Sequence, residues 1–372
     1  MPSPSTTSLR RPPRRLLRSR LARALTTPHG VDGFLGLVDP LLATDDVRAR
    51  VTRVRHQSAD TVTLTLTPNA NWTGFRSGQF VNVTVEVDGR RHTRCFSPAG
   101  PEQSGELELT VKAKPDGIVS RHLHDSARVG TVVTLSQALG DFTLPRPRPR
   151  RLLLVCGGSG ITPLMSMLRT LEAERYDGAV TFLQYACTSA DVLYRDELTS
   201  LAARGAFDVR TALTRETDAP EADLEGFFCR DHLNAVAPDH ADAETYVCGP
   251  TPLMDALAAV WAEDGIGERL HAESFVPTRA LVAPDADASA GTVTFAASGI
   301  AVDAGGATLL ELAEGAGLEP ASGCRMGICH TCTRDKTSGT VRNIVTGSVS
   351  DRECEAVQLC VNQPVGDVVV DL

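Results

Sequence analysis

Hydrophobic and polar residues alternate along much of residues 47–146, and this period of two is the pattern of half-buried β-strands. Glycine and proline interrupt the alternation at short intervals. Short strands separated in this way are typical of antiparallel barrels and sandwiches. We therefore predict an antiparallel β-barrel over residues 47–146. The alternating apolar positions are Val62, Leu64 and Leu66; Val81, Val83 and Val85; and Leu107, Leu109 and Val111.

The pattern changes after a proline- and arginine-rich connection, Pro145–Arg151, which we expect to be stiff. Leu152–Val155 is a continuous apolar run, as in a parallel strand that is buried on both faces. A glycine-rich turn and a helical stretch, Pro163–Glu174, follow it, and further apolar segments occur at Val180–Ala186 and Val247–Cys248. This order predicts an α/β domain with a doubly wound parallel sheet over residues 150–278.

The remainder divides into a linker and a small domain. Residues 279–291 are rich in alanine, aspartate and proline, which predicts a flexible linker. Residues 292–372 predict a compact α+β unit of the β-grasp type, with strands near 293–295, 300–302 and 368–370 and a helix near 308–316. Three domains fit a chain of 372 residues.

Four cysteines in this last unit have the spacing Cys324-x4-Cys329-x2-Cys332, followed by Cys360 after 27 intervening residues. This is the plant-type spacing for a [2Fe–2S] cluster, in which one loop supplies three thiolates and a distant strand the fourth. Small residues in the loop let backbone N–H groups approach the cluster sulfurs. We predict that the four cysteines are the metal ligands of a one-electron carrier.

Structural zinc is the competing interpretation, but it usually shows two Cys-x2-Cys pairs or a Cys2His2 pattern. His330 lies inside the loop, yet four thiolates already complete the cluster. Cys354 competes with Cys360 for the fourth position. We prefer Cys360 because it follows the apolar segment Val357–Leu359.

The net charge of −9 conceals a strongly basic start, because seven arginines precede the first acidic residue, Asp32. Within the N-terminal extension, residues 1–46, the segment Arg14–Leu25 places Leu17 and Leu21 on one helical face with arginines around it. Such a segment can form an amphipathic helix on an anionic membrane surface or dock on an acidic partner. A disordered tail rich in arginine, serine and proline is the equal alternative. The arginines are Arg10, Arg11, Arg14, Arg15, Arg18, Arg20 and Arg23.

Composition also excludes several classes of protein. No apolar run approaches 18 residues, so we predict no transmembrane helix. The acidic body argues against nucleic acid as a partner. Ten cysteines without a signal peptide fit reduced thiols better than a secreted disulfide scaffold. We expect a cytoplasmic protein that can attach peripherally to the inner face of the cell membrane through its basic segment.

Four motifs carry candidate cofactor chemistry. Arg94-Cys95-Phe96-Ser97 offers a guanidinium for a pyrophosphate, an aromatic ring for a flat cofactor and a hydroxyl for a ring nitrogen. Gly117-Ile118-Val119-Ser120, at the start of an expected helix, can cradle a phosphate. Gly158-Ser159-Gly160-Ile161-Thr162-Pro163 is a nucleotide loop between strand and helix, and Cys248-Gly249-Pro250 ends a strand where open α/β sheets bind ligands.

In this order the motifs resemble those of the ferredoxin–NADP reductase superfamily over residues 47 to about 278, with a plant-type ferredoxin fused behind them. The nearest resemblance is to bacterial reductases that supply electrons to membrane acyl-CoA desaturases. It rests on the arginine-rich start, the segment Thr27–Val31 and the cluster loop Gly323–Cys332.

The resemblance implies a role for each motif. Arg94 and Ser120 would hold the flavin pyrophosphate, and Phe96, in place of the usual tyrosine, would lie against the isoalloxazine or the ribityl chain. A pyrophosphate site favours FAD over FMN, which has no pyrophosphate to hold. The catalytic residues would be Ser97 near flavin N5, Cys248 beside the nicotinamide, and Glu273, which with Phe275 closes the flavin pocket. Gly158, Gly160 and Thr162 would contact the phosphates of the pyridine nucleotide.

The choice of coenzyme rests on a further likeness. Thr188-Ser189 and Tyr194-Arg195 resemble the contacts to the 2′-phosphate in plant-type reductases, which favours NADPH. NADH remains open, since Asp191 could instead accept from the ribose hydroxyls. Arg195 could also be a solvated helix residue paired with Glu197 or Asp191.

These expectations describe an electron-transfer chain, in which NADPH gives a hydride to FAD and single electrons pass to the [2Fe–2S] cluster and then to a partner protein. The expected acceptor is a membrane di-iron acyl-CoA desaturase, which would place the protein in fatty acid desaturation and lipid metabolism. The alternatives are a soluble oxygenase, either a Rieske ring hydroxylase or a cytochrome P450, and a non-enzymatic redox sensor.

Overall fold

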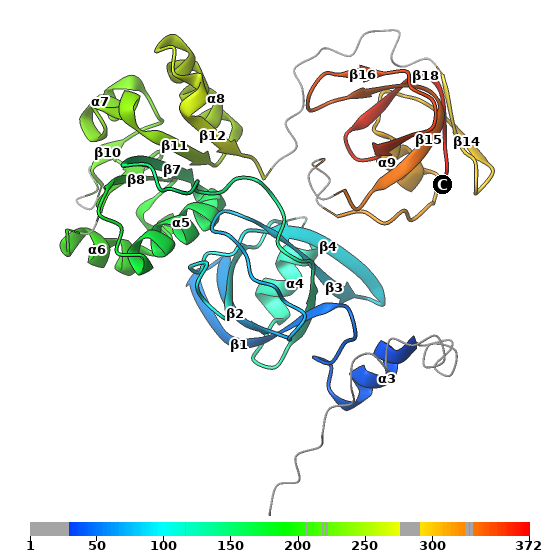
Figure 1. The fold of residues 1–372 in the computed structure, drawn as a ribbon, viewed down its shortest axis with the longest axis horizontal. Helices are drawn as coiled ribbons and strands as arrows, with labels where there is room; N and C mark the ends of the chain where they lie inside the picture. The colour runs from blue at the N-terminus through cyan, green and yellow to red at the C-terminus, as the bar shows by residue number, and fades with distance from the viewer. Residues whose placement is uncertain are drawn as a thin grey trace, which may run out of the picture.

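The computed structural model describes residues 30–115, 117–205, 207–217, 219, 222–275, 291–323, 327 and 330–372. The predicted basic helix, most of the predicted linker and the predicted ligands Cys324 and Cys329 lie outside these residues. Figure 1 shows the barrel in blue and cyan, the α/β domain in green and the C-terminal domain in orange and red. No helix in the described part of the chain combines the length and the apolar composition needed to span a membrane.

The barrel is a curled antiparallel sheet with the strand order β4-β3-β6-β1-β2-β5. Its strands are β1 (Val47–Ser58), β2 (Thr61–Pro68), β3 (Val81–Val87), β4 (Arg90–Phe96), β5 (Leu107–Lys112) and β6 (Val132–Leu135). The alternating apolar residues face one core, which α4 (Ile118–Ser126) covers with Val119 and Leu123. A short helix, α3 (Gly30–Val38), precedes the sheet, and Asp32 accepts a hydrogen bond from the Thr44 backbone at 2.8 Å.

The α/β domain contains a parallel sheet with the order β10-β9-β8-β7-β11-β12. The strands are β7 (Arg151–Gly157), β8 (Ala179–Ala186), β9 (Asp208–Leu213), β10 (Leu224–Glu225), β11 (Glu244–Cys248) and β12 (Leu270–Glu273). The helices are α5 (Ile161–Ala173), α6 (Arg195–Ala203), α7 (Arg230–Val236) and α8 (Thr251–Glu263), with short 3₁₀ turns η1 (Gly158–Gly160), η2 (Ser189–Asp191), η3 (His240–Asp242) and η4 (Gly267–Arg269).

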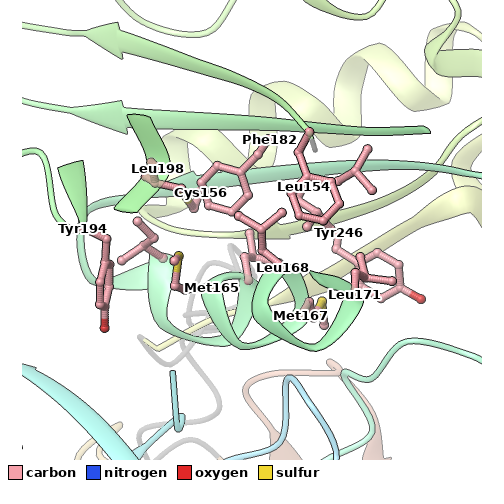
Figure 2. Packing of buried hydrophobic residues seen from close by; sticks show 14 of the residues in the cluster. Leu154, Cys156, Met165, Met167, Leu168, Leu171, Phe182, Tyr194, Leu198 and Tyr246 are labelled. Atoms are coloured by element: carbon pink, nitrogen blue, oxygen red, sulfur yellow. The ribbon is translucent and has the colours of Figure 1, made fainter. Parts of the chain in front are cut away.

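Both faces of this sheet are covered, as the continuous apolar run at Leu152–Val155 predicts. On one face, Leu154 and Cys156 pack with residues of α5 and α6, and Figure 2 shows this core. On the other face, Leu153 and Val155 pack with residues of α7 and α8, including the fully buried Trp261. The strand order reverses at β7, between β8 and β11, and such a reversal is where open α/β sheets bind ligands.

The C-terminal domain is a mixed sheet in which β13 pairs with β18 in parallel and the other strand pairs are antiparallel. Its elements are β13 (Thr292–Phe295), β14 (Ile300–Asp303), α9 (Leu309–Gly315), β15 (Thr333–Asn343), β16 (Val349–Ser350), β17 (Glu355–Gln358) and β18 (Asn362–Val370). Thr308 and Glu311 form a reciprocal capping box at the start of α9. The predicted multidomain class, barrel plus doubly wound α/β plus small α+β domain, is confirmed.

The barrel and the α/β domain meet through a polar interface. The Ser166 hydroxyl of α5 donates to the Gly100 carbonyl at 2.6 Å, and the Thr170 hydroxyl accepts from the Glu102 backbone at 3.0 Å. The connection between the two domains is tied to α5, because Arg148 pairs with Glu174 at 2.7 Å. This interface fixes the barrel against the carboxyl ends of the parallel strands, where the candidate site lies.

Candidate active site

A cavity of about 590 Å³ opens between the barrel and the α/β domain. That volume is within the range of small-molecule and cofactor sites. Its wall combines the end of β4, the outer face of β5, the start of α4, the turn before α5 and the end of β12. Residues from both domains therefore surround one space. Among the predicted site residues in its wall are Arg94, Phe96, Ser97, Ser120, Thr162 and Glu273.

The end of β4 places the Arg94–Ser97 motif in the cavity wall. Cys95 donates its thiol hydrogen to Asn82 of the neighbouring β3, with a sulfur–oxygen distance of 2.9 Å. Arg94 donates to the Thr93 carbonyl at 2.7 Å. Ser97 is buried, and its hydroxyl makes no hydrogen bond of standard geometry among the described residues, although it lies close enough to Glu273 to lower the pKa of that carboxyl. A buried polar atom on a cavity wall without a partner fits a site that pairs it with a bound group.

The start of α4 is a tight turn in which Gly117 lies close to the Ser120 side chain. A Cβ atom on Gly117 would lie 2.3 Å from the Ser120 hydroxyl oxygen. That hydroxyl accepts from the Lys114 backbone at 3.2 Å and donates to the Gly117 carbonyl at 3.3 Å. The helix N-terminus thus lines the cavity with backbone N–H groups, which suits a phosphate.

Glu273 ends β12 and is the most strongly perturbed acid of the cavity. Its side chain is buried, and Oε2 has no hydrogen-bond partner among the described residues. Burial raises the pKa of its carboxyl to about 8, against a smaller lowering from the Ser97 hydroxyl. Near neutral pH the carboxyl is therefore largely protonated and can donate a hydrogen bond into the cavity. An acid of this kind is a functional-site candidate.

Cys248 lies opposite Glu273 in the register of β11 and β12, and opposite Cys156 of β7. Burial, with smaller contributions from Glu273 and Cys156, raises the pKa of the Cys248 thiol well above its usual range. The thiol is therefore neutral, which excludes a thiolate nucleophile. Gly160 packs directly on this strand end, because a Cβ there would lie 2.2 Å from the Cys248 carbonyl oxygen. The nucleotide loop and the Cys248-Gly249-Pro250 turn consequently form one surface.

The segment Thr188–Arg195, which we call the coenzyme loop, is held by internal contacts. Asp191 accepts from the Thr188 backbone at 3.1 Å and from its hydroxyl at 2.8 Å. Arg195 donates to the Ser189 carbonyl. Tyr194 does not face solvent, because its hydroxyl lies 2.5 Å from Thr110 of the barrel. Asp191 is thus already engaged with Thr188, and Tyr194 with the barrel.

Sequence reasoning did not identify Glu216, whose carboxylate binds both hydrogen-bond donors of Ser189. Its carboxylate accepts from the Ser189 backbone at 2.5 Å and from the Ser189 hydroxyl at 3.2 Å. The exposed Arg215 precedes it, and its backbone donates to the Cys187 carbonyl at 2.9 Å. The sequence signal for these residues was their place directly after the end of β9. Thr110 and Lys112 of β5 were also missed, although the strand alternation places both on the face opposite Leu109 and Val111.

The C-terminal domain brings together two of the predicted cluster ligands. Cys332 and Cys360 are both buried, and the Cys360 backbone N–H points at the Cys332 sulfur at 3.5 Å. Gly327 has φ of +76°, and a Cβ there would lie 3.0 Å from Val361. Cys354 is exposed, and its sulfur lies 3.9 Å from the Thr337 carbonyl. Adjacent buried thiols with a backbone N–H directed at sulfur fit an iron–sulfur cluster.

Comparisons with known protein families agree with the division of the chain into three domains. Residues 48–144 match the family "Oxidoreductase FAD-binding domain", residues 154–259 match "Oxidoreductase NAD-binding domain", and residues 295–362 match "2Fe-2S iron-sulfur cluster binding domain".

Two related proteins match most of the chain. A protein from Mycobacterium tuberculosis named NADPH oxidoreductase is 37% identical over 359 residues, covering 95% of this chain and 91% of that protein. The glycine betaine monooxygenase reductase subunit of Pseudomonas aeruginosa is 31% identical over 80% of this chain and 87% of its own. The solved structure of phthalate dioxygenase reductase has a TM-score of 0.61 and 25% identity, and it covers 88% of this chain and 98% of its own.

Proposed function

This chain belongs to the ferredoxin–NADP-reductase family of oxidoreductases that combine FAD-binding, NAD-binding and C-terminal [2Fe-2S] domains, and from that premise we propose that it is the reductase component of an oxygenase system. Its cofactors are FAD, NAD(P)H and a [2Fe-2S] cluster. Membership of an oxidoreductase family replaces the redox-sensor interpretation. The observation that carries the oxidoreductase part of the proposal is the interdomain cavity, whose wall holds both Ser97 and Glu273.

FAD, when bound, accepts hydride from reduced nicotinamide and releases electrons singly, which is chemistry that the protein itself does not supply. The protein's own residues orient the flavin and the coenzyme, and Glu273 holds a proton next to the flavin. Ser97 and the protonated Glu273 offer hydrogen-bonding atoms to the flavin ring system. Arg94, with the N-terminus of α4, offers positive charge and N–H groups for the pyrophosphate. Cys248 and Gly160 form the surface on which the nicotinamide end of the coenzyme would lie.

We propose Cys324, Cys329, Cys332 and Cys360 as the cluster ligands. The support from the described residues is the burial and proximity of Cys332 and Cys360. The exposed Cys354 is directed at the Thr337 carbonyl instead. Its position argues for Cys360 as the fourth ligand.

For the coenzyme we propose NADPH. Ser189 and Arg195 lie together at the coenzyme loop, and Arg215 adds an exposed guanidinium at the end of β9. A phosphate monoester is matched by such a group of cationic and hydroxyl donors. The name of the related mycobacterial protein, NADPH oxidoreductase, points the same way. The negative charge of Glu216 on Ser189 would repel a 2′-phosphate, and its effect on the affinity for NADPH can be measured.

The proposed acceptor is inferred from what two similar proteins are named for. One is the reductase subunit of a glycine betaine monooxygenase, and the solved structure is a dioxygenase reductase. The desaturase expected from the sequence has no such support from these relatives. It remains the second candidate because seven arginines precede Asp32 and because α3 exposes Leu37 and Val38 at 84% and 81%. A basic segment followed by exposed apolar residues suits a membrane-bound acceptor.

Reconstitution tests the proposal. Purified protein is mixed with an oxygenase component or with a membrane desaturase, and NADPH oxidation coupled to product formation is followed. The oxygenase is expected to stimulate coupled turnover. Stimulation by the desaturase alone would establish the second candidate. Deleting residues 1–29 is the matched control, because it should abolish binding to anionic vesicles only if the basic segment docks on membranes, while cytochrome c reduction stays unchanged.

A further inference from the structure

Tyr194 has an unusual backbone conformation at the junction between the coenzyme loop and α6. Its φ and ψ are 57° and 25°, in the left-handed region. Residues other than glycine, asparagine and aspartate rarely adopt this conformation. Strain of this kind persists where surrounding contacts determine the geometry, and it concentrates at functional sites. The contacts that hold Tyr194 therefore require an explanation.

The Tyr194 side chain is anchored in the other domain. It is 3% exposed, and its hydroxyl lies 2.5 Å from the Thr110 hydroxyl of β5. Thr110 in turn lies 2.7 Å from the Thr63 hydroxyl of β2. Figure 2 shows the Tyr194 ring at the margin of the α/β core, with its hydroxyl directed away from the sheet. The coenzyme loop is thus joined to the barrel through a chain of buried hydroxyl groups.

A second contact joins the middle of the same loop to the same strand. Lys112 follows Thr110 by two residues, so both side chains lie on one face of β5. The Lys112 ammonium lies 3.7 Å from Asp191 and 3.0 Å from Asp60. Asp191 is the residue that closes the capping box on Thr188. Both Thr110 and Lys112 line the interdomain cavity.

Arg169 of α5 completes the anchor. Its guanidinium lies 5.0 Å from the centre of the Tyr194 ring, within the range of a cation–π contact. It also donates to Glu197 of α6 at 2.6 Å and to Glu108 of β5 at 2.7 Å. The start of α6, the barrel strand and the helix that follows the nucleotide loop therefore meet at one point. Arg195, which holds the Ser189 carbonyl, is the next residue after this point.

We propose that Thr110 and Tyr194 are positioning residues that set the coenzyme loop against the flavin cavity and thereby raise affinity for the pyridine nucleotide. The inference rests on the proposed function, because it explains how the proposed coenzyme site is held in place. Anchoring removes freedom from the loop before the coenzyme arrives, and a preorganised loop binds more tightly than a loose one. The residues act through Ser189 and Arg195 and need not touch the coenzyme.

The test compares Tyr194→Phe and Thr110→Val, each of which removes one hydroxyl of the pair, with Thr110→Ser, which retains it. Thr84→Val is the matched control, because it removes a barrel hydroxyl that pairs with Thr93 at 2.7 Å and takes no part in the chain to Tyr194. KM and kcat for NADPH with ferricyanide are measured, together with Kd for NADP⁺ by calorimetry and the melting temperature. A single neutral hydrogen bond supports an effect of about threefold to tenfold.

We expect KM and Kd to rise by that factor in Tyr194→Phe and Thr110→Val, with kcat within about twofold of the wild type. Thr110→Ser and Thr84→Val should keep the wild-type KM and Kd. The proposal is overturned if all the variants share the wild-type Kd and only the melting temperature falls, because the contact would then be structural alone. If the wild-type protein oxidises neither NADPH nor NADH, the proposed function fails, and the comparison of Kd values still decides the positioning role.

Discussion

The carboxylate of Glu216 accepts hydrogen bonds from both the backbone N–H and the hydroxyl of Ser189, at 2.5 and 3.2 Å. Ser189 is a residue that the family resemblance assigns to the 2′-phosphate of NADPH. A phosphate and a carboxylate cannot share these donors without repulsion, since like charges at close range are unfavourable. If Ser189 binds the 2′-phosphate as proposed, Glu216 weakens the binding of NADPH and leaves the binding of NADH unchanged.

Glu216→Gln should lower KM for NADPH by about fivefold and leave KM for NADH within about twofold, because glutamine keeps an acceptor for the Ser189 N–H and removes the charge. Steady-state ferricyanide reduction with both coenzymes measures the change. Glu172→Gln is the control, since it removes the same charge from α5, where Glu172 pairs with Arg204 at 2.6 Å. A rise in KM for both coenzymes would contradict the argument and make Glu216 a support of the loop.

Glu273 should make the stability of the barrel interface dependent on pH. Its folded-state pKa of about 8 lies above the usual value of 4.5. The unfolded chain therefore releases this proton at lower pH than the folded protein does. The contribution of Glu273 to the free energy of unfolding is therefore greatest below about pH 4.5, and it is lost as the pH rises to about 8.

Glu273→Gln mimics the protonated form and lacks this titration. From pH 5 to pH 8 the melting temperature of the wild type should fall relative to that of the variant, by several degrees. The transition is followed by the release of flavin fluorescence, which reports the barrel. Parallel pH profiles for the two proteins would show that Glu273 ionises normally in the folded state.

Cys360→Ser should remove the cluster and leave the flavin. The predicted result is loss of iron and acid-labile sulfide, with cytochrome c reduction reduced at least about tenfold and ferricyanide reduction retained. Cys354→Ser is a matched control in the same domain, because Cys354 is exposed. If Cys354→Ser loses the cluster and Cys360→Ser keeps it, the ligand assignment is wrong.

Arg169 should matter for stability far more than an arginine on the surface. The Arg169 side chain is 11% exposed and its guanidinium pairs with Glu108 and Glu197, so Arg169→Met leaves two partly buried carboxylates without their cation. We expect a loss of about 3 kcal/mol in the free energy of unfolding. Arg204→Met, which breaks a pair with 58% and 36% exposed side chains, should cost less than about 1 kcal/mol. Urea denaturation followed by circular dichroism compares them, and equal losses would contradict the role of the interface.

The order of domains was predictable because it depends on local patterns. The alternation at Val62, Leu64 and Leu66 requires a half-buried strand, and the run Leu152–Val155 requires one that is buried on both faces. The cysteine spacing and the glycines at 158 and 160 were also informative, because each implies a local geometry. Gly160, for example, packs on the Cys248 carbonyl.

The contacts between domains were not predictable. Tyr194 follows the family pattern for a coenzyme contact, yet its hydroxyl binds Thr110 in a different domain. Nothing in the spacing of the two residues, which lie 84 positions apart, indicates this contact. The contact of Glu216 with Ser189 likewise depends on how β8 and β9 align in the sheet, which single-sequence patterns do not specify.

The central claim is that one polypeptide takes electrons in pairs from the coenzyme and passes them on singly. Anaerobic titration of the purified protein with NADPH, followed by visible absorbance, tests it most directly. The account predicts bleaching of both the flavin and the iron–sulfur absorbance after about one and a half equivalents of NADPH, and bleaching of the flavin alone in Cys360→Ser. A wild-type protein whose flavin is reduced while its cluster remains oxidised, or which contains no iron and acid-labile sulfide, would contradict the account.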